Sequence, residues 1–147
     1  MSGIVVGVDG SPHSQKALDW AIAEAVLRHA PLTVVAVSPV AASVWGLSAE
    51  HYPADEQSRE QVQQATQELV GKALAARGAG TGPAVTVHAV AGRPADELIK
   101  ASEDADLLVV GARGAGGFAK LMMGSVSSQV SHHAGCPVAV VPGEHAR

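Results

Sequence analysis

The stretch from Asp106 to Val141 constrains the fold more than any other part of the chain. Residues 107–110 form a short apolar run that stops at Gly111, and such a run predicts a strand buried on both faces of a sheet. Glycine leaves backbone N–H groups open to a ligand, and the start of a helix adds unpaired N–H groups. A strand, a glycine loop and a helix start in this order indicate a phosphate site, although tight turns need glycines too. The residues concerned are Gly111, Ala112, Arg113, Gly114, Gly116 and Gly117, then Gly124 and Ser125.

Strand and helix patterns alternate along the rest of the chain. Apolar runs at 4–8 and 32–37 predict buried strands, and the alternating residues 85–89 predict a strand at a sheet edge. Apolar residues at helical spacing predict helices over 12–29, 55–77, 95–102 and 125–133, and residues 137–142 complete a fifth strand. Ser11 and Pro12 suit the start of the first helix, and Gly135 suits a left-handed cap after the last one. This pattern predicts an α/β fold with one open five-stranded parallel sheet and helices on both faces.

Composition excludes several classes of protein. The chain has 147 residues and a net charge of −4, which argues against a nucleic-acid partner, since such proteins present basic stripes. No apolar run is long enough to span a membrane, and the first ten residues lack a signal-peptide pattern, so we expect a cytoplasmic protein. The single Cys136 excludes an internal disulfide, and no Cys/His spacing suits zinc. His132 and His133 suit the negative end of a helix better than a metal.

The spacing of the glycines resembles a known family signature. Gly111-x-x-Gly114, nine further residues and then Gly124-Ser125 is similar to the G-x2-G-x9-G-[ST] motif of ATP-binding universal stress proteins. The segments VVGVDGS near the start and CPVAVVP near the end resemble the same family, so the resemblance covers residues 1–147 as one domain. It implies the strand order 3-2-1-4-5, for which the residues alone offer only the edge pattern of 85–89. In that order the first and fourth strands meet at the switch point, where ligands bind.

The resemblance also implies roles for individual residues. Asp9, Gly10, Ser11 and Val37 would meet adenine and ribose. Gly111, Arg113 and Gly114 would pass along the ribose and the first phosphates, in a binding loop that also includes Ala112, Gly116 and Gly117. Gly124, Ser125, Val126 and Ser127 would hold the outer phosphates of ATP at the start of the last helix, with Mg²⁺ accompanying them. A homodimer through Val138–Val141 is implied as well, and the last strand, apolar and uncharged at a predicted sheet edge, also favours it.

Other interpretations stay open or fail. Asp9 could instead only favour the dipole of the first helix, and Trp45 and Tyr52 could cover a base or pack the 38–54 loop onto the body. Gly114-x-Gly116-x-x-Ala119 matches a permissive dinucleotide fingerprint, but it follows the fourth strand rather than the first. Neither a P-loop nor the residues of a phosphoacceptor receiver are present. A nucleotide-binding regulator with slow or absent hydrolysis is therefore favoured over an ATPase or adenylyl-transfer enzyme, because no nucleophile–base pair is evident.

Overall fold

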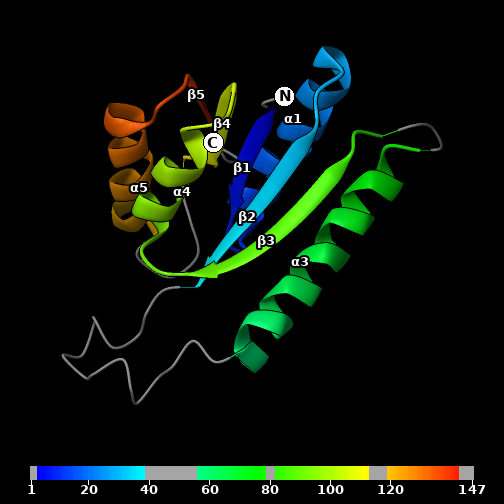
Figure 1. The fold of residues 1–147 in the computed structure, drawn as a ribbon, viewed down its shortest axis with the longest axis horizontal. Coiled ribbons are helices and arrows are strands. Elements are labelled where there is room, and N and C mark those ends of the chain that lie inside the picture. Colours follow the sequence, from blue (N-terminus) through cyan, green and yellow to red (C-terminus); the bar gives the residue numbers. More distant parts are fainter. Residues whose placement is uncertain (1–2, 39–55, 79–81, 113–118, 143–147) are drawn as a thin grey trace, which may run out of the picture.

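The computed structural model describes residues 3–38, 56–78, 82–112 and 119–142, with the backbone alone for 38, 56–58 and 119–125. Strands and helices alternate along the described chain, as the sequence patterns predict (Figure 1). The strands are β1 (Ile4–Val8), β2 (Leu32–Ser38), β3 (Val85–Ala91), β4 (Leu107–Gly111) and β5 (Val138–Val141). The helices are α1 (Pro12–Arg28), α3 (Glu56–Ala76), α4 (Pro94–Ser102) and α5 (Ala119–His133). The predicted loop with Trp45 and Tyr52 lies outside the described residues.

The five strands form one parallel sheet in the order β3-β2-β1-β4-β5, which confirms the predicted order. β1 lies at the centre, where Ile4 pairs with Leu32 of β2 on one side and with Leu107 of β4 on the other. β4 is buried at every position, as expected of a strand with helices on both of its faces. β3 alternates, with Thr86 and His88 exposed, and lies at a sheet edge as predicted.

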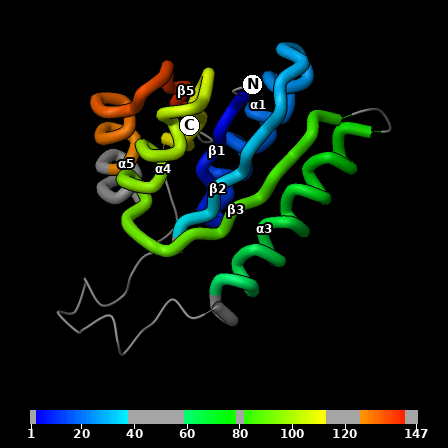
Figure 2. The backbone as a smooth tube through the Cα atoms, in the orientation of Figure 1, coloured from blue at the N-terminus to red at the C-terminus, as the bar shows by residue number. Residues whose placement is uncertain are grey.

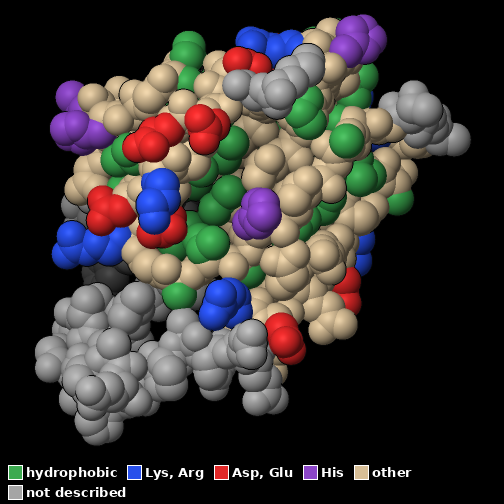
Figure 3. All heavy atoms as spheres, in the orientation of Figure 1, with side chains coloured by type: hydrophobic (Ala, Val, Ile, Leu, Met, Phe, Trp, Pro, Cys, Tyr) green, Lys and Arg blue, Asp and Glu red, His purple; other side chains and the backbone are tan. Residues whose placement is uncertain are grey.

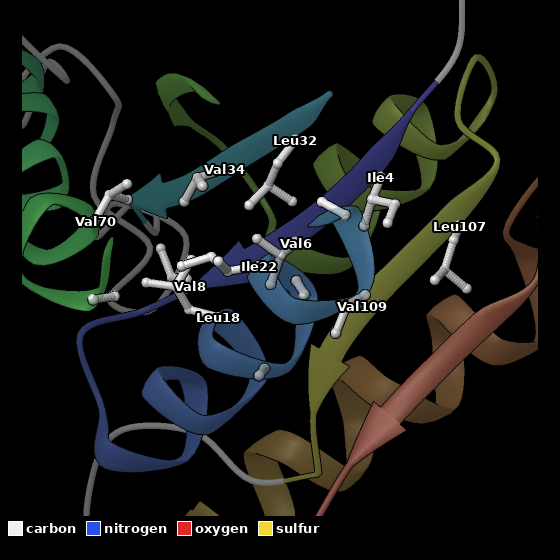
Figure 4. Packing of buried hydrophobic residues seen from close by; sticks show 14 of the residues in the cluster. Ile4, Val6, Val8, Leu18, Ile22, Leu32, Val34, Val70, Leu107 and Val109 are labelled. Atoms are coloured by element: carbon white, nitrogen blue, oxygen red, sulfur yellow. The ribbon is translucent and has the colours of Figure 1, made fainter. Parts of the chain in front are cut away.

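Helices cover both faces of the sheet, so successive side chains of a strand enter different cores (Figure 2). On one face Ile4, Val6 and Val8 point toward Leu18 and Ile22 of α1, with Val70 of α3 nearby (Figure 4). The other face packs Val5, Val35, Leu108 and Val110 against Leu98 of α4 and Val130 of α5. In the described chain, no helix has the length and apolar character that crossing a membrane requires.

The predicted start of α1 is confirmed. The Ser11 hydroxyl accepts a hydrogen bond from the Ser14 amide at 3.1 Å, and Pro12 occupies the first turn. Both features favour helix initiation. The helix ends where His29 takes the left-handed conformation, at φ 53°, two residues before Pro31, which cannot continue it.

The predicted left-handed cap at Gly135 is wrong. Among the described glycines, only Gly10, Gly78 and Gly92 have positive φ. The amide of Gly135 instead donates to the Ser102 hydroxyl at 2.9 Å, and a Cβ added at Gly135 would lie 3.3 Å from Cα of Glu103. A side chain here would be tight against the chain after α4, so the small size of glycine suits this close approach.

Candidate functional site

The carboxyl ends of the parallel strands meet at one edge of the sheet. Val8 closes β1 beside Ala36 of β2, while β4 runs on the other side of β1 and ends at Gly111. Ligands of open α/β sheets bind at this edge, next to the point where the strand order reverses. Residues that directly follow these strands are therefore the candidates for binding.

A pocket of about 390 Å³ opens at the ends of β1 and β2 beside α3. It brings together three of the predicted site residues, Asp9, Gly10 and Val37. α3 forms the opposite wall, and Figure 1 shows the first turns of this helix at the same end of the sheet as the tip of β2. The full lining is Val8, Asp9, Gly10, Ala36, Val37, Val62, Ala65, Thr66 and Leu69. Such apolar walls with one carboxylate suit the face of a flat organic ring.

The turn after β1 holds Asp9 in a fixed orientation. One carboxylate oxygen of Asp9 accepts the Ser11 amide at 2.9 Å, and the Asp9 amide donates to the Ser14 hydroxyl at 3.2 Å. That hydroxyl donates in turn to the Ser11 carbonyl at 3.1 Å. Gly10 has φ 82°, a left-handed conformation that favours glycine. Asp9 is exposed at the pocket while it also lies beside the start of α1, so its two sequence interpretations are compatible.

Ser11 has a structural role in the described state. It is 6% exposed, its hydroxyl caps α1, and it is not among the residues that line the pocket. The interpretation of Ser11 as a residue that meets the ribose therefore remains a prediction, and its described contacts serve the β1–α1 turn.

The glycine loop is described only where it leaves β4. Gly111 is buried as the last residue of that strand, and the Ala112 amide donates to the Val141 carbonyl of β5 at 2.9 Å. This amide is therefore engaged by the sheet. Arg113, Gly114, Gly116 and Gly117 lie outside the described residues.

The predicted start of the last helix at Ser125 is wrong. α5 begins at Ala119, so Gly124 and Ser125 lie inside the helix rather than at its start. The unpaired N–H groups of a helix are those of its first turn, and in α5 they precede Gly124. Val126 packs against the core on the α4–α5 face, and the Ser127 carbonyl accepts the Ser131 hydroxyl at 2.6 Å. Phosphate binding by Gly124–Ser127 remains a prediction.

The α3 wall of the pocket, which includes Val62, Ala65 and Leu69, was not predicted from the sequence. Thr66 is also part of this wall, and its hydroxyl donates to the Val62 carbonyl at 2.7 Å. The length of the predicted helix could have revealed this wall. A helix of 21 residues extends about 31 Å. A strand of seven residues such as β2 extends only about 23 Å. Part of the apolar face of α3 must therefore extend past the strands.

Metal ligands are not gathered in the described part of the molecule. Across the ranges given above, no group of three or more His, Cys, Asp or Glu side chains could hold a metal ion.

Comparison with known proteins gives consistent matches. The model of the universal stress protein family matches residues 1–142. Universal stress protein Rv1996 of Mycobacterium tuberculosis is 37% identical over 154 aligned residues, which cover 97% of this chain and 48% of the relative. The chain therefore spans about half the length of the curated relatives it matches.

Solved structures share the fold. A universal stress protein crystallised in complex with cAMP is 27% identical, with a TM-score of 0.66 over 95% of both chains. A universal stress protein from Archaeoglobus fulgidus in complex with dAMP has a TM-score of 0.62 over 98% of both chains. At 23% identity, this second likeness bears on the fold alone.

Proposed function

Since the chain belongs to the universal stress protein family, we propose that it binds an adenine nucleotide at the carboxyl edge of its sheet. The observation that carries the proposal is the pocket formed by Asp9, Gly10 and Val37 with the α3 wall. Its volume of about 390 Å³ falls within the usual range for small-molecule pockets, about 300–1,000 Å³. The relative in complex with cAMP, 27% identical, supports an adenine ligand.

The proposed ligand is ATP with Mg²⁺. The apolar residues of the pocket would contact the base, and the Asp9 carboxylate would accept hydrogen bonds from the ribose hydroxyls. Glycines after Gly111 would let the phosphates approach the backbone toward Gly124–Ser127. Mg²⁺ is usually held by phosphate oxygens together with one or two carboxylates, so it would bind as part of the nucleotide complex.

The bound nucleotide would act as a signal rather than as a substrate. Hydrolysis requires an oriented water and groups that neutralise developing charge on the phosphates. Asp9 is the carboxylate in the pocket lining, and its described bond to the Ser11 amide serves the turn. We therefore infer a nucleotide-dependent regulator with slow or absent hydrolysis in the cytoplasm.

Calorimetric titration with MgATP tests the proposal. We expect saturable binding with one nucleotide per chain, and weaker binding of GTP because the pocket is proposed to contact the base. The same mixture should release phosphate below about 1 per second, the low end of ordinary enzyme rates. Absence of heat with ATP, ADP, AMP and cAMP alike, from protein freed of bound ligand by denaturation and refolding, would contradict nucleotide binding.

A homodimer through β5 is the second part of the proposal. β5 lies at a sheet edge, and Val140 on it is 41% exposed. An apolar edge strand without charge invites pairing with another strand, and pairing with its own copy in antiparallel orientation closes as a dimer.

Val140→Lys should halve the mass observed by sedimentation, because a charge would replace an apolar side chain in the contact. Thr86→Lys is the matched control, since Thr86 is exposed on β3 at the opposite edge of the sheet. A wild-type protein that sediments as a monomer at micromolar concentration, or a Val140→Lys dimer, would overturn the β5 assignment.

A further inference from the structure

β3 and β5 are both edge strands, but the outward-facing backbone groups of the two strands differ in their hydrogen bonding. In a strand, the N–H and C=O groups of one residue point to the same side, and the side alternates from residue to residue. The Ala84 carbonyl accepts the Leu32 amide at 2.8 Å, so Ala84 faces β2. Alternation therefore directs the backbone groups of Val87 and Ala89 away from β2, toward the open edge.

Gln63 of α3 binds this open edge. Its side-chain nitrogen Nε2 donates to the Val87 carbonyl at 2.7 Å, and its oxygen Oε1 accepts the Ala89 amide at 2.9 Å. In a parallel ladder, one residue of a neighbouring strand donates to residue i−1 and accepts from residue i+1. The carboxamide of Gln63 makes the same pair of bonds and takes the place of a residue in a sixth strand.

The β5 edge carries no such substitute within the described residues. The Pro137 and Val141 carbonyls accept amides on the β4 side, from Leu108 at 3.0 Å and Ala112 at 2.9 Å. Alternation then directs the backbone groups of Val138 and Val140 outward. Within the described ranges, the β3 edge thus has a filled hydrogen-bonding position and the β5 edge has none.

We propose that Gln63 closes the β3 edge against strand pairing, so that a second copy of this chain can pair with the sheet only at β5. Edge strands carry unpaired groups that recruit other strands unless something blocks them. Figure 1 shows α3 running along β3 on the outer side of the sheet, and Gln63 reaches the middle of the strand from this helix. The proposal is independent of nucleotide binding and concerns the direction of self-association.

Sedimentation of Gln63→Ala tests it. We expect the weight-average mass to rise at least about twofold over wild type at tens of micromolar. A monomer would pair at the freed edge and close as a dimer, whereas a dimer joined through β5 has two freed β3 edges and would add further copies. The comparison holds whether wild type sediments as a monomer or as a dimer. Gln64→Ala is the matched control, an exposed glutamine on the same helix, and should sediment as wild type.

Gln63→Glu separates edge closure from a merely structural role. Like alanine, glutamate cannot donate to the Val87 carbonyl, but it places a charge at the edge, and charges oppose strand pairing. We expect Gln63→Glu to keep the wild-type mass. If Gln63→Ala and Gln63→Glu associate equally, loosening of α3 would explain the rise in mass, and the inference is overturned. It is also overturned if folded Gln63→Ala keeps the wild-type mass.

Hydrogen exchange gives a second measurement on the unaltered protein. The Ala89 amide should exchange at least about tenfold more slowly than the Val87 amide, since a tenfold protection corresponds to a bond of about 1.4 kcal/mol. Both amides face the same edge, and within the described residues only that of Ala89 has the Gln63 oxygen as acceptor. Equal rates would show that the Gln63 bonds do not close this edge in solution.

Discussion

Replacing Ala65 by tryptophan should raise the Kd for MgATP at least about 100-fold, a loss of about 2.7 kcal/mol. Ala65 is an exposed residue of α3 that lines the pocket at the ends of β1 and β2. An indole at this position would fill the space proposed for adenine, while the core beneath the helix would keep its packing. Calorimetry on folded protein, with the far-ultraviolet circular dichroism of wild type, measures the effect.

The control is the same substitution nearly three turns of helix later. Ala75 is exposed on α3 and is not among the pocket-lining residues, so Ala75→Trp should bind MgATP as wild type does. Unchanged affinity in Ala65→Trp would mean that the nucleotide binds elsewhere. Weaker binding in both variants would instead indicate a general effect of tryptophan on this helix.

Leu18→Ala should lower the free energy of unfolding by about 2–5 kcal/mol, a large part of the roughly 5–15 kcal/mol typical of a folded domain. Leu18 is fully buried in the middle of α1, and it packs with Ile22 against the inner face of β1 (Figure 4). Truncation would leave a cavity that the surrounding strands cannot close. Urea unfolding followed by circular dichroism gives the change.

Leu27 provides the comparison on the same helix. It is 75% exposed, so Leu27→Ala should change the free energy of unfolding by no more than about 0.5 kcal/mol. Similar losses in the two variants would show that helix propensity rather than core packing dominates the stability of α1.

Local signals predicted the sheet well. The buried run of β4, the cap at Ser11 and the alternation of β3 each depend on neighbours in the chain, and the structure confirms all three. The space-filling view agrees with the alternation of β3, which predicts that one face of this strand is poorly covered. Hydrophobic and histidine side chains are visible at the surface between α4 and β3 (Figure 3).

Features that depend on distant residues were missed. Gly135 passes close to Glu103, a residue far away in the chain, and no local sequence pattern predicts that approach. Glycine costs about 1 kcal/mol inside a helix, so Gly124 was expected to lie before the last helix. In the structure α5 begins at Ala119 and contains Gly124. The α3 wall of the pocket became evident only once the helix lay beside β2.

The central position of β1 has a consequence for folding during synthesis. Ile4 pairs with Leu32 on one side but with Leu107 on the other, 103 residues later. At about 5–20 residues per second, β4 emerges roughly 5–20 s after β1. Until then the three-stranded unit of β3, β2 and β1 ends at β1, an apolar strand with one open side. The central strand of the finished protein is therefore the exposed edge of its nascent chain, and aggregation during slow synthesis should begin there.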